Sequence, residues 1–214
     1  LYRANIPARY GGRVASVLDV KVKNPYVDQF KLTGGIGILS SRLAVETPII
    51  KDKLMLNAGF RAGFTDFLFP VFSKRLQNTE ANFVDGTVKL LYLPSENDQI
   101  TFTGFYSNDF YQLDLISQIQ NISSNSNQYD FSILNATLNW MHSFDEGSSL
   151  KTVFVGSNYN PNIYFPEVET DNIIDYESAI RYLSLSSEFS KKIDSEFGYF
   201  GGIQVNQYKI QPGI

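Results

Sequence analysis

Apolar and polar residues alternate along most of this chain. In the stretch "LMLNAGFRAGF", every second residue from Leu54 to Phe64 is apolar, and most residues between them are polar or glycine. A period of two places successive side chains on opposite faces and predicts a β-strand with one apolar face. Similar runs recur between residues 30 and 207, with no helical stripe of comparable length. They predict about nine strands and an all-β fold.

The connections between these runs fall into two classes. The stretches "PIIKDK", "LPSENDQ", "SFDEGSS" and "SKKIDS" are short and turn-like. The others, after a first tight "SS", are long and polar and cover about residues 69–82, 113–128 and 160–177. This alternation is typical of a membrane β-barrel with short turns on one side and long loops on the other. Strands of about ten residues also match a tilted membrane-spanning strand better than the five or six residues usual in soluble sheets.

A membrane barrel assigns the two faces of each strand to two environments. In a bilayer every backbone N–H and C=O group must pair within the protein, so a sheet crosses only as a closed barrel. The apolar faces then contact lipid, and the polar faces line the interior. Five charged side chains fall on the interior faces: Arg42, Glu46, Arg61, Asp85 and Lys89. The alternative is a soluble, sugar-binding β-sandwich with one wetted face, in which aromatic residues stack on sugars.

The composition changes this picture little but excludes several functions. Charged residues make up 19% of the chain and aromatic residues 14%. The net charge of -4 argues against a nucleic-acid partner, which requires a clustered basic surface. With no cysteine and one histidine, His142, the chain lacks both a disulfide framework and the ligands of a zinc site. No catalytic pattern surrounds His142, so we expect no enzymatic activity and no cofactor.

The stretch before the first predicted strand has a different character. It reads "IPARYGGRVASVLDVKVKNP" from Ile6 and contains a compact turn motif: Arg9, Tyr10, Gly11, Gly12 and Arg13. The two glycines can adopt positive φ and reverse the chain. This stretch resembles the C-terminal end of the plug domain of TonB-dependent outer-membrane receptors, most closely those of the Bacteroidota. The following "GGIGILSSRLAVETPIIKDKLML" resembles the first barrel hairpin and the third strand of that family.

The motif departs from the wider family pattern at two places. Ala15-Ser16 stands where a Gly-Gly pair is usual, and Asp19 stands where an asparagine is usual. These departures weaken an assignment to siderophore receptors in particular.

The resemblance implies a two-part organisation. Residues 1–28 would be the C-terminal end of a plug, and residues 29–214 about nine strands of a larger barrel of about 22 strands. Plug arginines of the family pair with barrel glutamates, which implies that Arg9 or Arg13 contacts Glu46. Arg61 is a further expected plug–barrel contact.

The same resemblance implies active import of a scarce nutrient through the outer membrane of a Gram-negative bacterium. TonB would act on a segment upstream of this chain, and outer-membrane lipid would surround the barrel. We expect ligand contacts near Tyr111, Asn160 and Tyr164, close to the long loops. Siderophore, corrinoid, glycan and peptide all stay open as ligands, as does a surface lipoprotein partner. The alternative within membrane barrels is a passive porin or adhesin-like barrel.

Overall fold

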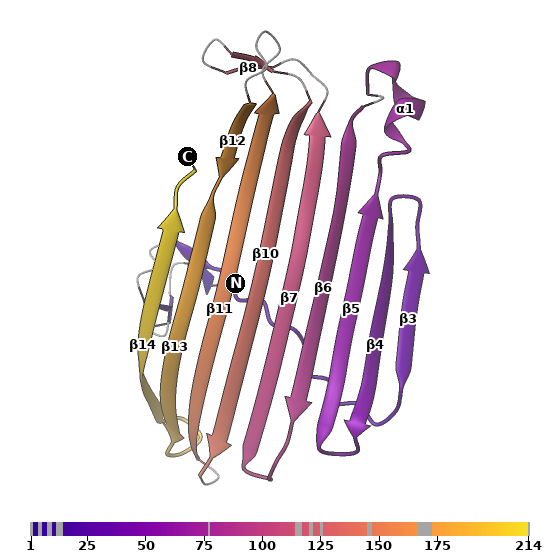
Figure 1. Cartoon of the computed structure of the whole chain (residues 1–214). Helices are drawn as coiled ribbons and strands as arrows, with labels where there is room; N and C mark the ends of the chain where they lie inside the picture. The colour runs from indigo at the N-terminus through magenta and orange to yellow at the C-terminus, as the bar shows by residue number, and fades with distance from the viewer. Residues whose placement is uncertain are drawn as a thin grey trace.

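The structure of this chain is a computed structural model that describes residues 2–3, 6–7, 10–11, 15–76, 78–113, 117–119, 122–124, 126–144, 147–166 and 173–213. The prediction of an all-β antiparallel fold is confirmed. One large antiparallel sheet of ten strands dominates the molecule (Figure 1).

Nine strands of this sheet follow one another in chain order, each paired with the next. They are β3 (Lys31–Ile36), β4 (Ser40–Ile50), β5 (Leu54–Phe64), β6 (Glu80–Tyr92), β7 (Asp98–Leu113), β10 (Asn127–Ser143), β11 (Ser148–Pro166), β13 (Ala179–Lys192) and β14 (Gly198–Gln211). The tenth, β12 (Ile173–Glu177), pairs with the end of β11 and is separated from β13 only by Ser178.

Several short elements lie outside the large sheet. β1 (Tyr2–Arg3) pairs with β2 (Ser16–Val17), and β8 (Ser117–Ile119) pairs with β9 (Ile122–Ser124). A short helix α1 (Phe69–Phe72) and a 3-10 turn η2 (Lys74–Leu76) connect β5 to β6. Figure 1 shows α1 and β8 at one end of the sheet, opposite the end that carries the tight turns between β4 and β5, β6 and β7, and β13 and β14.

The first of these tight turns begins later than the sequence pattern predicts. β4 continues through Pro48 to Ile50, and the pairing with β5 shifts between these two residues. A bulge tolerates proline because the residue need not donate a hydrogen bond there. Asp52 then takes a positive φ of 59°, and the amide of Lys53 donates to the carbonyl of Ile50 at 3.1 Å.

The last tight turn, between β13 and β14, is held by an aspartate. The Oδ1 atom of Asp194 accepts the backbone N–H groups of Glu196 at 2.8 Å and Phe197 at 2.7 Å. These two bonds lower the pKa of Asp194, because they stabilise its ionised form.

The sheet has two faces of different polarity. We call the face that carries Leu90, Phe102 and Leu138 the outer face, and the face that carries Lys89 and Thr103 the inner face. The outer face is apolar and open, with Leu138 and Phe154 each 47% exposed and Leu185 53% exposed. Side chains on this face therefore have no covering layer among the described residues.

The inner face is partly covered by the segment formed by residues 15–28, which crosses behind the sheet in Figure 1. One row of buried residues crosses three strands of this face, with Leu91 opposite both Met55 and Thr101. Leu91 is 0% exposed, Met55 is 4% exposed and Thr101 is 6% exposed. Pro25 of the crossing segment is also fully buried. The small core thus lies between the segment and the inner face.

Candidate functional site on the inner face of the sheet

The crossing segment is attached to the inner face by hydrogen bonds. The Nζ atom of Lys89 donates to the carbonyl of Val22 at 2.5 Å. The hydroxyl of Tyr26 donates to Oε1 of Gln99 at 2.8 Å. Because these contacts lie 67 and 73 residues apart in the chain, they are set by the tertiary fold. The segment therefore follows a defined path over the inner face.

The segment is also organised internally around Asp19. Its carboxylate accepts the hydroxyl of Tyr10 at 2.8 Å and lies 3.1 Å from the ammonium of Lys21. The bond from Tyr10 is the main reason that the pKa of Asp19 lies below its ordinary value, and Lys21 lowers it further. The Tyr10 side chain thus bonds to the crossing segment through Asp19. The neighbouring Gly11 is exposed.

Acid is expected to release this segment, and Tyr10→Phe should shift the release to higher pH. Because the pKa of Asp19 is lowered, the stability that its ionised carboxylate gives to this segment is fully present above the ordinary pKa near 3.8. That stability is lost as the pH falls through the lowered pKa. Removing the hydroxyl raises the pKa toward the ordinary value. Cleavage within residues 15–28 by pepsin, measured across acidic pH, reports the release.

Tyr26→Phe is the matched control, because it removes a hydroxyl from the same segment that contacts Gln99 and not Asp19. It should increase cleavage without moving the pH midpoint. An identical midpoint in wild type and Tyr10→Phe would contradict the role assigned to the Tyr10–Asp19 bond.

A second feature of the inner face is a row of charged residues near the β3–β4 turn. Arg42 of β4 lies directly opposite Arg61 of β5, which in turn lies opposite Asp85 of β6. Arg61 donates through Nε to Oδ2 of Asp85 at 2.7 Å, and its Nη2 lies 2.7 Å from the same oxygen. The guanidinium also lies 4.8 Å from the centre of the Phe83 ring. Arg61 is therefore held from two sides.

Glu46 lies on the same face of β4 as Arg42, four residues further along the strand. It pairs in register with Lys31 and with Asn57, and Asn57 Nδ2 lies 3.5 Å from its Oε1. The expected partners Arg9 and Arg13 lie outside the described residues, as does Gly12. The predicted contact between a plug arginine and Glu46 therefore stays a prediction.

The three expected ligand residues lie on different faces of the long strands. Tyr111 is on the inner face of β7 and is 41% exposed. Asn160 and Tyr164 are on the outer face of β11, and Asn160 Nδ2 lies 3.5 Å from Oγ of Ser132. The structure thus places Tyr111, and not the other two, on the inner face.

Near the long connections, the polarity of the two faces is reversed. On the outer face, Asn108 donates to Asp130 at 2.5 Å and Gln128 donates to Gln112 at 3.0 Å. On the inner face at this level lie the following apolar and aromatic residues of β10 and β11: Tyr129, Phe131, Ile133, Tyr159, Ile163 and Phe165. The rings of Tyr129 and Phe165 pack edge to face at 5.8 Å. The outer face is therefore suited to water at this end.

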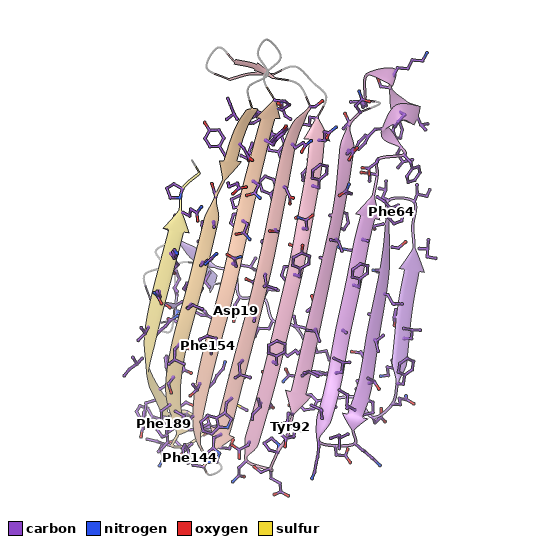
Figure 2. The ribbon with its side chains drawn as sticks, in the orientation of Figure 1. Asp19, Phe64, Tyr92, Phe144, Phe154 and Phe189 are labelled. Atoms are coloured by element: carbon purple, nitrogen blue, oxygen red, sulfur yellow. The ribbon has the colours of Figure 1, made fainter. Side chains whose placement is uncertain are left out.

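Aromatic side chains gather at the opposite end, near the tight turns, as Figure 2 shows for Tyr92, Phe144 and Phe189. There Trp140 Nε1 donates to Asp98 Oδ1 at 2.9 Å, and His142 Nδ1 lies 2.8 Å from the same oxygen. The ring of His142 packs against Phe144 at 4.7 Å. Rings with a polar edge and an apolar body suit a boundary between water and an apolar medium.

The described part of the chain contains no group of three or more His, Cys, Asp or Glu residues placed to hold a metal ion. No helix among these residues has the length and apolar character needed to cross a membrane. Comparisons with protein-family models, with curated proteins and with solved structures find no match to this chain.

Sequence reasoning assigned Arg42, Asp85 and Lys89 to the interior but did not single them out as site residues. It also did not identify Asp19 as the centre of the crossing segment. Alternation indicates the face of a residue, whereas only the register shows that Arg42 lies opposite Arg61.

Proposed function

We propose that this chain is part of a TonB-dependent receptor that imports a scarce nutrient across the outer membrane. In this proposal the sheet is a section of a transmembrane barrel of about 22 strands, and residues 15–28 are the end of its plug. TonB acts on another part of the same receptor, and lipid surrounds the outer face. The ligand classes are siderophore, corrinoid, glycan and peptide, and a surface lipoprotein stays open as a partner.

The observation that carries the proposal is an apolar band that crosses the outer face at an angle to the strands. In β6 the band ends at Val84, because the next outward residue is Asn82. In β14 it ends at Val205, before Gln207. The register places Val205 level with Leu90 of β6, which is six residues from Val84.

This offset accumulates over the five steps from β6 to β14. About 1.2 residues per step, at about 3.4 Å per residue and 4.8 Å between strands, corresponds to a tilt of about 40°. Strands of membrane barrels tilt by about 35–45°. If tilted strands cross a hydrocarbon layer with a flat boundary, the apolar band ends at a different residue level on each strand, which produces this slant.

The aromatic residues at the other end of the band slant in the same direction. Tyr92 and Trp140 lie at one level of the register, Phe189 lies two residues nearer the tight turns, and Tyr199 lies four residues nearer. Aromatic girdles border the apolar band of membrane barrels. Two limits that slant in the same direction therefore support a membrane setting for the outer face.

The edges of the sheet support a larger assembly. Within the described residues, β3 and β14 pair on one side only, and every residue of both strands is exposed. A long open edge presents unpaired N–H and C=O groups, which cannot be left unsatisfied in a bilayer. Further strands on both sides would satisfy them.

The two alternative functions fit the observations less well. A soluble sugar-binding sandwich would pack a second sheet on the apolar outer face, whereas that face is open in the described part of the chain. A passive porin would leave its interior to water, whereas residues 15–28 lie across the inner face here. A segment in the interior favours regulated import.

Import by this protein is expected to depend on the inner-membrane proton gradient. Deleting the gene in the source bacterium should abolish growth on one of a panel of single nutrient sources. Uptake of that nutrient should stop when an uncoupler collapses the gradient, while uptake through an unrelated porin continues. Uncoupler-resistant uptake would support a passive barrel instead, and a complete protein that stays monodisperse without detergent would exclude the membrane location.

A further inference from the structure

The arginine pair on the inner face lacks enough acidic partners. Arg42 and Arg61 lie directly opposite each other on adjacent strands, where like charges are destabilising. Asp85 is bound to Arg61 through two contacts at 2.7 Å. Among the described residues, Arg42 has no hydrogen bond or ion pair, and a Cβ atom added to Gly35 would lie 3.5 Å from its Nε. Its guanidinium is therefore available beside a glycine.

A hollow of about 480 Å³ lies next to this pair. In the register row beside the arginines, Thr33, Ala44, Gly59 and Thr87 follow one another across four strands. All four of these residues line the hollow together with both arginines and with Asp85, whose carboxylate already binds Arg61. A Cβ atom added to Gly59 would meet nothing within 4 Å, so no other atom occupies the space above Gly59 in the hollow.

We propose that this hollow binds an anionic group, a carboxylate or a phosphate, of the imported solute. A planar guanidinium with several donors matches both groups, and hydroxyls such as those of Thr33 and Thr87 can add hydrogen bonds. The hollow lies within the range of about 300–1,000 Å³ typical of small-molecule sites. This inference rests on the import function proposed above.

The place of the hollow also fits a solute that arrives from outside. Arg42 lies two residues from the start of β4 at Ser40, next to the β3–β4 turn. This turn is at the same end of the sheet as α1 and β8 (Figure 1). In the proposed barrel, that end carries the long outer loops.

Two substitutions test the hollow by different routes in the complete receptor. Arg42→Gln removes the available charge and keeps hydrogen-bonding capacity, whereas Gly59→Phe fills the hollow and keeps both arginines. Gly201→Phe is the matched control, because a Cβ atom there also meets nothing within 4 Å and the residue lies on the outer face. The probes are inorganic phosphate and citrate, titrated against detergent-purified protein at low chloride.

We expect wild type and Gly201→Phe to bind at least one probe, and both Arg42→Gln and Gly59→Phe to weaken that binding by about tenfold or more. The inference is overturned if wild type binds neither probe, or if Arg42→Gln binds as tightly as wild type. Unchanged binding together with faster proteolysis of residues 15–28 would assign Arg42 to a carboxylate of the plug instead.

Insertion and energised uptake, measured on the same variants, separate the two proposals. A receptor that inserts and imports in a gradient-dependent manner, with an Arg42→Gln titration equal to wild type, would refute only the anion site. A protein that needs no detergent, or whose uptake resists the uncoupler, would refute the import function whatever the titrations show.

Discussion

Replacing Leu138 by Arg should destabilise the inserted protein by about 2 to 4 kcal/mol, as for other arginines placed on the lipid face of a membrane barrel. Leu138 lies on the outer face in the apolar band, in register with Phe102 and Phe154. Its neighbour Thr137 lies on the inner face, in register with Thr103 and Val155. Thr137→Arg should therefore cost less than about 1 kcal/mol, because interior substitutions are tolerated. Denaturant titration in lipid vesicles measures both losses.

Stability alone would not separate lipid from a second protein layer, so the same two positions need a solvent probe. The chain has no cysteine, which allows a single nitroxide label at position 138 or 137. Oxygen dissolved in the bilayer should relax a label at 138, and a water-soluble nickel chelate should relax a label at 137. A label at 138 that neither reagent reaches would show protein packed on the outer face and would contradict the membrane assignment.

Replacing Gly202 by Ala should cost about 1 to 3 kcal/mol, whereas the same change at Gly201 should be neutral or slightly stabilising. An added Cβ atom at Gly202 would lie 2.6 Å from the carbonyl oxygen of Ser187 and 3.1 Å from Cα of Glu188. Both are backbone atoms of β13, so no side-chain rotation relieves the contact. β14 must shift, which disturbs its pairing with β13.

Gly201 provides the control because it adjoins Gly202 and faces the opposite side. A Cβ atom there would have no neighbour within 4 Å. The two alanine variants should be compared by denaturant titration under the conditions used for Leu138. Equal stability of the two variants would mean that the close approach of β14 to β13 at Gly202 is wrong.

The alternation of residues predicted the fold class and the two faces of the strands. The alternation from Leu54 to Phe64 placed Arg61 on the polar face, and the structure has β5 over the same residues. This works because the direction of a side chain on a strand depends only on whether its position is odd or even. Strand ends were harder to predict, since β4 extends through Pro48 by means of a bulge.

The reversal of polarity near the long connections was missed although the sequence carries a sign of it. In β10 the adjacent apolar residues Ile133 and Leu134 interrupt the alternation, and the apolar positions change from odd to even there. An interruption of this kind marks the level at which the surroundings of a strand change. Asn160 and Tyr164 were proposed as ligand residues without this information and lie on the outer face.

The sequence by itself determined that the chain forms long antiparallel strands with one apolar and one polar face, because that pattern is local to each strand. Only the tertiary structure decided which residues of different strands lie side by side. Register depends on turn geometry and on pairing along the whole strand, so the Arg42–Arg61 pair and the slant of the apolar band could not be read from any single segment. The path of residues 15–28 over the inner face likewise depends on contacts such as Lys89 with Val22, 67 residues apart.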